Sequence, residues 1–471
     1  MEILDLVRRF AGHSGVSALR QVWNDDSVRT IHLKGLSASA TPMLFGAMAV
    51  GDTPWQTPVA LFVLNDLEEA GYFYHDLTQM LGVGQVLFFP SSYKRAIKYG
   101  KKDSANEVLR TEVLTRLVAF PNPSRGGEFG PAMTESPLLG RGRGEAPLYI
   151  VSYPDALAEL VVSQNTLSDR SLPLAVGDTI EIPEIEKLLV TEGFERVDYV
   201  YEPGQFAVRG SIIDVFSYAS EYPFRIDFFG DEIDSIRTFE IESQLSRDKV
   251  QHVSIVPNFD GDEAKGLVSF FDFLPEGSAL AFQDYMWTHE RIEQLGEEGL
   301  SLQAVQAADE GVSCSINLLE PTDFIRKTAS RRRIEFGTKA TSTVQASVTF
   351  DTSPQPLFHK NFELVEQSLT DLIERGYQIY ILTDSAKQAE RLKTIFEERG
   401  NDIPFTAVDK TIHGGFTDAT MRVACFTDHQ IFDRFHKYNL RSDKARSGGY
   451  TCGSGRISDG RKSRPHASWH R

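Results

Sequence analysis

The sequence is poor in cysteine and contains no long apolar run. Its 471 residues include three cysteines, Cys314, Cys425 and Cys452, which share no CxxC or Cys/His spacing. This excludes a disulfide framework and a zinc site of the usual spacing, and it indicates a reducing compartment. No run of about 18 apolar residues occurs, and the N-terminal stretch MEILDLVRRFAGH lacks the apolar centre of a signal peptide. We therefore expect a cytoplasmic protein that does not enter a membrane.

Positive charge is outnumbered, since 49 Lys or Arg against 66 Asp or Glu give a formal net charge of -17 at pH 7. Such a surface repels a polyanion, which excludes broad nonspecific binding along a nucleic-acid backbone and favours protein partners. Basic residues gather in residues 441–471, which contain eight Lys or Arg against two Asp or Glu. This segment has almost no aliphatic side chains, so we expect a disordered tail and interpret it as non-native sequence. A nucleic-acid-binding tail is the alternative.

Motifs for nucleotide and metal chemistry are missing as well. The turn LKGLSASATPM follows a predicted strand, where a phosphate-binding loop would lie. A working loop has the form GxxxxGK[ST], whose glycines let the backbone approach the phosphates and whose lysine and hydroxyl bind phosphate and magnesium. The second glycine and the lysine are absent, which leaves a degenerate nucleotide loop at Gly35, Ser37, Ser39 and Thr41. No histidine or cysteine has catalytic or metal-binding spacing, so we predict no catalytic residue, metal or cofactor.

The chain pattern predicts an α/β protein of three to four domains. Apolar runs such as TPVALFVLN and QVLFFP alternate with helical segments, which is typical of a parallel sheet. Period-two runs then replace this pattern. We expect an α/β domain at 1–120 and 244–335, a Pro/Gly-rich flexible insertion at 121–146, an α+β domain at 147–243, a linker at 336–357, a small αβα domain at 358–440 and the tail at 441–471.

One arginine stands out in the α+β segment. In YEPGQFAVRGSIIDVF, read as a single alternating strand, Arg209 shares its face with Ile213 and with two nearer neighbours, Ala207 and Ser211. These neighbours are too small to cover it, so its planar guanidinium can bind a carboxylate. Alternatively, Arg209 pairs within the sheet with Asp214 or Glu202.

A second arginine, Arg196, lies close by in the sequence segment GFERVD. Two arginines beside Phe206 or Ile213 have the composition of a protein-interface hot spot. The sequence therefore predicts a partner-binding surface at these four residues.

Two segments resemble a known family. The stretch YEPGQFAVRGSIIDVFSYASEYPFRIDFFGDEIDSIRTFEIESQLS looks like the transcription-repair coupling factor family and, more distantly, like domain 2 of the excision-repair protein UvrB. The segment GGFTDATMRVACFTDHQIFDRFHKYN resembles the end of the same family's N-terminal region, with Gln430 at a usually acidic position. The resemblance covers nearly all of residues 1–440.

The resemblance implies a UvrB-like module, in which a degenerate P-loop-type α/β domain carries an inserted α+β domain and is followed by a second small α/β domain. It further implies that the inserted domain binds UvrA. The arginines that bind UvrA in the family fall on Arg196 and Arg209 here. Ala207 stands where UvrB has another arginine, which leaves a contact at that position without support.

Longer members of the family carry an RNA polymerase-interaction domain and an ATP- and magnesium-dependent translocase of double-stranded DNA. No GxxxxGK[ST] or DEEH-like motif occurs in this sequence. We therefore interpret the chain as the product of a truncated gene, a monomer that keeps the UvrA-docking module and has no enzymatic activity. The alternative is a UvrB-like or helicase-like ATPase with an unrecognised nucleotide site, which measured ATP turnover distinguishes.

Overall fold

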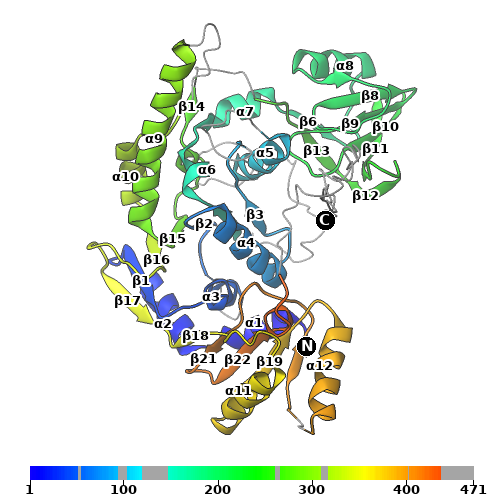
Figure 1. The fold of residues 1–471 in the computed structure, drawn as a ribbon. Coiled ribbons are helices and arrows are strands. Elements are labelled where there is room, and N and C mark those ends of the chain that lie inside the picture. Colours follow the sequence, from blue (N-terminus) through cyan, green and yellow to red (C-terminus); the bar gives the residue numbers. More distant parts are fainter. Residues whose placement is uncertain are drawn as a thin grey trace, which may run out of the picture.

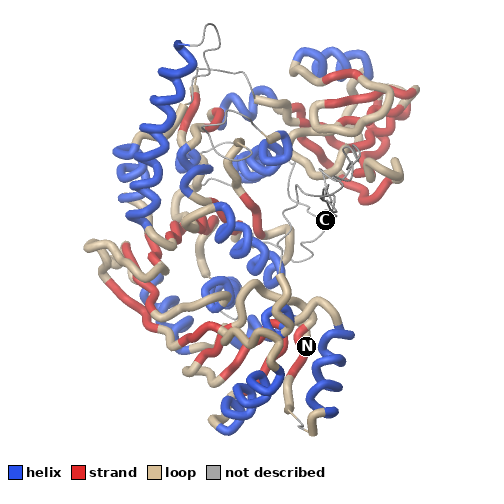
Figure 2. Tube along the Cα trace, in the orientation of Figure 1, coloured by secondary structure: helices blue, strands red, loops and turns tan. Residues whose placement is uncertain are grey.

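The computed structural model describes most of the chain, namely residues 1–50, 55–93, 103–118, 147–259, 266–308, 317–400 and 403–435. The insertion predicted at 121–146 and the tail predicted at 441–471 lie outside these residues. The described part forms an α/β domain, an inserted domain and a C-terminal domain (Figures 1 and 2). None of its helices is both long and apolar enough to span a bilayer.

A seven-stranded parallel sheet forms the first domain, with strand order β17-β1-β16-β15-β2-β4-β3. The adjacent inner strands β15 and β2 are apolar throughout because helices cover the sheet, as the sequence runs predict, whereas β16 carries a buried ion pair of Arg333 with Glu335. The strands are β1 (Thr30–Lys34), β2 (Val59–Val63), β3 (Val86–Phe88), β4 (Leu148–Ser152), β15 (Ala279–Phe282), β16 (Arg333–Glu335) and β17 (Ala346–Thr349).

Helices pack around this sheet in two groups. The α1, α3 and α4 helices contact one another, whereas α9 contacts α6 and α10 (Figure 1). The helices are α1 (Ile3–Phe10), α2 (Ser14–Trp23), α3 (Ala40–Ala49), α4 (Leu67–Leu81), α5 (Ser104–Val118), α6 (Pro154–Ala158), α7 (Gln164–Arg170), α9 (Tyr285–Ala308) and α10 (Pro321–Ala329). A short β5–β14 pair (Val161–Val162 with Leu267–Val268) and the 3₁₀ helix η2 (Phe270–Asp272) complete the domain.

The inserted domain is a six-stranded sheet of order β12-β11-β10-β9-β8-β7, with helix α8 (Ile182–Thr191) packed on one face. A separate β6–β13 pair lies at its base. The strands are β6 (Leu172–Ala175), β7 (Glu195–Arg196), β8 (Gln205–Arg209), β9 (Ile212–Val215), β10 (Phe224–Phe229), β11 (Glu232–Phe239), β12 (Ser246–Val250) and β13 (His252–Ile255). A tight turn at Gly230 and Asp231 joins β10 to β11 in an antiparallel hairpin.

The domain boundaries predicted for this insertion are wrong at both ends. The domain was expected at 147–243, but β4 (residues 148–152) is an inner strand of the first sheet, between β2 and β3. At the other end, β13 (residues 252–255) pairs with β6 and so extends the insertion beyond residue 243. Local patterns cannot assign β4 or β13 to a sheet, because their partners are distant in sequence.

The C-terminal domain has a five-stranded mixed sheet of order β18-β21-β22-β19-β20. The predicted helix–strand–helix unit is confirmed as α11, β19 and α12, and Gly376 follows the first helix with φ 81°. The elements are β18 (Thr352–Pro354), α11 (Phe362–Glu374), β19 (Gln378–Leu382), α12 (Ala386–Glu398), β20 (Thr406–Val408), β21 (Phe416–Asp418), β22 (Val423–Thr427) and α13 (Asp428–Ile431).

The linker predicted at 336–357 is wrong, because this segment contributes strands to two sheets. β17 (residues 346–349) pairs with β1 at the edge of the first sheet, and β18 (residues 352–354) pairs with β21 of the C-terminal sheet. Only Phe350 and Asp351 separate the two strands. The first and C-terminal domains also share a hydrophobic core, in which Phe10 contacts Phe416 at a ring-centroid distance of 5.8 Å.

Candidate functional site: an arginine face on the inserted domain

The predicted strand around Arg209 is a two-stranded hairpin. β8 ends at Arg209 and β9 begins at Ile212, and the register pairs Arg209 with Ile212 and Val208 with Ile213. Gly210, with φ 62°, and Ser211 form the two-residue turn between them. Glycine suits this turn because the left-handed region carries no steric penalty for it.

The hairpin moves Ile213 to the other face from the one that a single strand gives it, whereas Phe206 stays on the face opposite Arg209. Residues paired across an antiparallel ladder point to the same face, so the turn puts Ile213 on the face of Val208 and Phe206. Phe206 and Ile213 are both fully buried, in the core beneath α8. The prediction that they lie exposed beside the arginines is therefore wrong. Their side chains pack in the core under the sheet whose opposite face carries Arg209.

Arg209 lies on the opposite face of the sheet. It pairs within the sheet and is also partly exposed, so both alternatives that the sequence offered are met in part. Its Nη2 donates to Asp214 of β9, which is one of the internal partners predicted. Its side chain nevertheless remains 37% exposed. The guanidinium carbon lies 5.1 Å from the centre of the Tyr199 ring, a cation–π contact that holds the group at the surface.

Arg196 lies at the same edge of the sheet but on the other face. It belongs to β7, where it pairs with Phe206 and so shares the face that α8 covers. Its side chain is 61% exposed and its Nη1 lies 3.0 Å from Oε1 of Glu186 on α8. The two predicted arginines therefore flank one sheet edge and do not form a single flat patch.

Two tyrosines at this edge were missed by the sequence reasoning. Tyr199 and Tyr201 are 50% and 52% exposed, although large aromatic side chains are more often buried. Both follow β7, and Tyr199 contacts Arg209 directly. The sequence feature that indicates exposed tyrosines is the segment DYVYEP, in which two tyrosines lie among acidic residues. Exposed tyrosine and arginine together are the composition enriched at the centre of protein interfaces.

The predicted degenerate nucleotide loop is packed against the C-terminal domain. Gly35 has φ 75°, and a Cβ there would lie 2.0 Å from the carbonyl oxygen of Phe350. The amide of Ser37 donates to Oγ1 of Thr352 at 2.9 Å, and the amide of Ser39 donates to the carbonyl of Gly414 at 3.1 Å. The backbone donors of Ser37 and Ser39, which could otherwise meet a phosphate at a helix N-terminus, are thus bonded within the chain.

The other hydroxyls of this loop are turned inward. Thr41 is buried inside α3, and Oγ of Ser39 donates to Asp76 of α4 at 2.5 Å. Asp76 also accepts a hydrogen bond from the amide of His413 at 2.7 Å. Burial raises the pKa of the Asp76 carboxyl to about 7, against the opposing effect of these two hydrogen bonds. A titratable group therefore lies at the junction of two domains.

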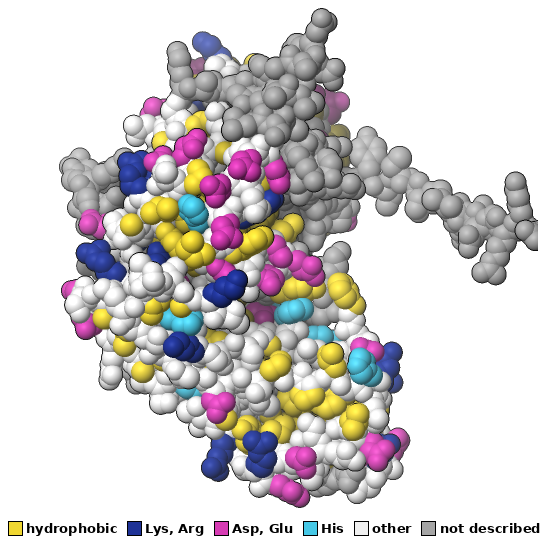
Figure 3. All heavy atoms as spheres, turned by 60° about the vertical axis from the view of Figure 1, so that its left-hand side comes forward, with side chains coloured by type: hydrophobic (Ala, Val, Ile, Leu, Met, Phe, Trp, Pro, Cys, Tyr) yellow, Lys and Arg dark blue, Asp and Glu magenta, His cyan; other side chains and the backbone are white. Residues whose placement is uncertain are grey.

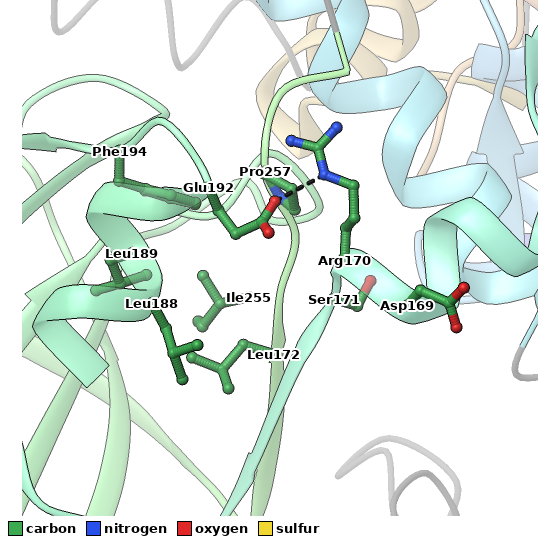
Figure 4. A pocket seen from close by; sticks show the side chains of 10 residues that line it. All are labelled: Asp169, Arg170, Ser171, Leu172, Leu188, Leu189, Glu192, Phe194, Ile255 and Pro257. Atoms are coloured by element: carbon green, nitrogen blue, oxygen red, sulfur yellow. Dashed lines mark hydrogen bonds and ion pairs between the residues drawn. The ribbon is translucent and has the colours of Figure 1, made fainter. Parts of the chain in front are cut away.

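A cavity of about 140 Å³ lies at the base of the inserted domain, between α8 and the β6–β13 pair (Figure 4). Apolar side chains line most of it, and the ion pair between Arg170 and Glu192 (2.7 Å) lies at its margin. Its volume is well below that of typical cofactor pockets.

Among the described residues, no group of three or more His, Cys, Asp or Glu side chains could hold a metal ion. Burial raises the pKa of the Cys425 thiol, as expected for a structural cysteine.

Comparison with known proteins agrees with this division of the chain. Residues 172–260 match the family model of the UvrB interaction domain. The inserted domain, which carries Arg196 and Arg209, is thus a UvrB interaction domain, and its matched bounds agree with the sheet boundaries found above.

The chain is also similar to curated proteins named transcription-repair-coupling factor. That of Bacillus subtilis is 28% identical over 225 residues, which cover 48% of this chain and 17% of the relative. Those of Haemophilus influenzae and Escherichia coli are 39% and 33% identical over 106 and 122 residues. These matches cover 22% and 24% of this chain, and 9% and 11% of the relatives. The predicted resemblance to this family is confirmed over the matched part, and this chain spans less than a fifth of each relative.

Proposed function

We propose that the inserted domain docks UvrA, and that the chain serves transcription-coupled excision repair through this contact. The observation that carries the proposal is the exposed guanidinium of Arg209, held against Tyr199 on a UvrB interaction domain. Arg196 and Tyr201 extend the surface along the same sheet edge. Contacts with RNA polymerase and translocation on DNA would belong to parts of the relatives outside the matched region.

A protein partner suits the charge of this domain better than a nucleic acid does. Residues 172–259 contain seven Lys or Arg against seventeen Asp or Glu, so Arg209 is a local cation in an acidic setting. Over the α/β and C-terminal domains, the face drawn in Figure 3 likewise shows basic side chains scattered among acidic and apolar ones. Neither pattern gives the continuous basic stripe typical of phosphate-backbone binding.

We also infer that the loop at Gly35 to Thr41 is structural and does not bind a nucleotide. The missing lysine and the internally bonded amides of Ser37 and Ser39 support this inference. The ATPase alternative therefore has no site in this loop.

The test is the affinity of purified UvrA for the wild-type chain and for Arg209→Ala, measured by calorimetry. Loss of a charge-paired interface arginine should weaken binding by about 2–5 kcal/mol. Arg247→Ala is the matched control, because the Arg247 side chain is also 37% exposed, pairs with Glu240 and contacts a tyrosine ring, that of Tyr222. Arg247 lies in β12, at the opposite edge of the sheet. Equal effects of the two substitutions would refute this site.

A further inference from the structure

Arg209 shares its carboxylate with a second arginine. Asp214 of β9 lies opposite Ala207 on one side and opposite Arg225 of β10 on the other, so all these side chains point to one face of the sheet. Both guanidinium groups bond Asp214, whose side chain is only 1% exposed. One buried negative charge is therefore matched by two positive charges, which leaves a surplus cation on this face.

The two arginines are held very differently. Arg225 is 16% exposed and donates through Nε and Nη2 to both oxygens of Asp214, at 2.7 and 2.9 Å. Its Nη1 donates to the carbonyl of Gln244 at 3.1 Å, and its guanidinium carbon lies 4.5 Å from the centre of the Phe239 ring. The hydrogen bond to Asp214 raises the pKa of Arg225. Arg209 bonds Asp214 through Nη2 alone and is more than a third exposed.

The number of bonds that each arginine makes to Asp214 determines which of them can move away from that carboxylate. A buried carboxylate that loses its only cation is strongly destabilised, so a lone arginine beside Asp214 would be fixed there. Here the bidentate bond from Arg225 keeps Asp214 neutralised when Arg209 moves away. Arg209 can then present its planar fork to another planar acceptor without leaving a bare charge in the sheet.

We propose that Arg209 exchanges partners on docking, leaving Asp214 for a carboxylate of UvrA, while Arg225 remains on Asp214 as a positioning residue. This proposal rests on the proposed function and specifies its chemistry. It assigns Arg225 a role in docking although Arg225 need not touch UvrA.

The experiment measures UvrA affinity for variants that remove the charge of Asp214 or of Arg225. Asp214→Asn removes the internal competitor for Arg209, so affinity should rise about two- to fivefold, the equivalent of an exposed ion pair. Arg225→Gln leaves Arg209 as the sole cation on Asp214, so affinity should fall about tenfold or more. Combining the two substitutions should restore affinity to within about threefold of wild type, because no buried charge remains. Asp227→Asn, in the same strand as Arg225, should change it less than about twofold.

The outcomes separate this proposal from the proposed function. If wild type does not bind UvrA, or Arg209→Ala binds as wild type does, the docking function itself fails. If Arg209→Ala weakens binding but Asp214→Asn weakens it too, the exchange is refuted and the docking site stands. Should Asp214→Asn not fold, Arg225→Lys is compared with Arg225→Gln: the lysine variant keeps a cation beside Asp214 but cannot form the bidentate bond, so it should lose less affinity than the glutamine variant. Equal losses for the lysine and glutamine variants would then refute the exchange.

Discussion

Asp76 joins two domains through a buried carboxyl group, and its ionisation should control their docking. It accepts hydrogen bonds from Ser39 of the degenerate loop and from the amide of His413, at the margin of the C-terminal domain. Ser39 in turn bonds Gly414 through both its amide and its hydroxyl. We expect Asp76→Asn to keep this geometry without the charge, because its carbonyl can accept from His413 and its amide can donate to Ser39.

The magnitude follows from the difference between the folded and unfolded pKa values of Asp76. The ordinary value is 3.8 and the folded value is about 7, so the folded state binds the extra proton between these limits. The free energy of unfolding therefore decreases as pH rises through this range, by about 4 kcal/mol in all. Roughly 2–3 kcal/mol of that loss falls between pH 5 and pH 8. Asp76→Asn cannot ionise, so it should escape this loss and become more stable than wild type at pH 8.

Urea unfolding at several pH values from 5 to 8.5 measures the effect as a difference between the two proteins. Other ionisable side chains lie at this junction, including the buried pair of His13 and Asp418 and the ring of His429, and they are present in both proteins. Asp66→Asn, an exposed cap of the same helix, controls for the loss of one negative charge. A stability difference between wild type and Asp76→Asn that did not change with pH would refute the reasoning.

Two further predictions concern the buried Phe206 and the degenerate nucleotide loop. Phe206→Ala should lower the free energy of unfolding by about 3–5 kcal/mol in a urea titration, because Phe206 is fully buried. Phe229 is 83% exposed, so the control Phe229→Ala should change this free energy by less than about 0.5 kcal/mol. Equal effects would contradict the assignment of Phe206 to the core. The purified chain should hydrolyse ATP no faster than a protein-free blank, with or without DNA, and DNA-stimulated turnover would restore the ATPase alternative.

Much of the secondary structure could be predicted from the sequence, because its signals are local. Apolar runs mark β2 and β3, and Asp66 caps α4 by accepting from the amide of Glu69. Sheet membership could not be predicted in the same way. β4 follows the flexible insertion predicted at 121–146, and β17 follows a segment with no strong pattern, so their partners are set by long-range packing.

The candidate site was predictable in its residue types and only partly in its geometry. Arg209 was recognised from its small neighbours, and it is exposed; the sequence also offered Asp214 as an internal partner, and that contact exists. Ile213 was assigned to the wrong face because a two-residue turn reverses the alternation of the second strand. A glycine followed by serine in an alternating run is the signal for such a turn. The role of Arg225 depends on a register that sequence alone does not fix.

The proposed docking surface around Arg209 and the degenerate loop at Gly35 to Thr41 belong to different hydrophobic cores, so substitutions at the two sites can be tested separately. Phe206 and Ile213 lie in a core confined to the inserted domain, whereas the loop lies on the core shared by the first and C-terminal domains. Because packing couples residues mainly within one core, changes at Asp76 should leave the surface around Arg209 intact, and changes at Arg209 should leave the domain junction intact. A substitution at one site that altered the other would require coupling through the contacts between the two cores, which include the β6–β13 pair and the ion pair of Arg170 with Glu192.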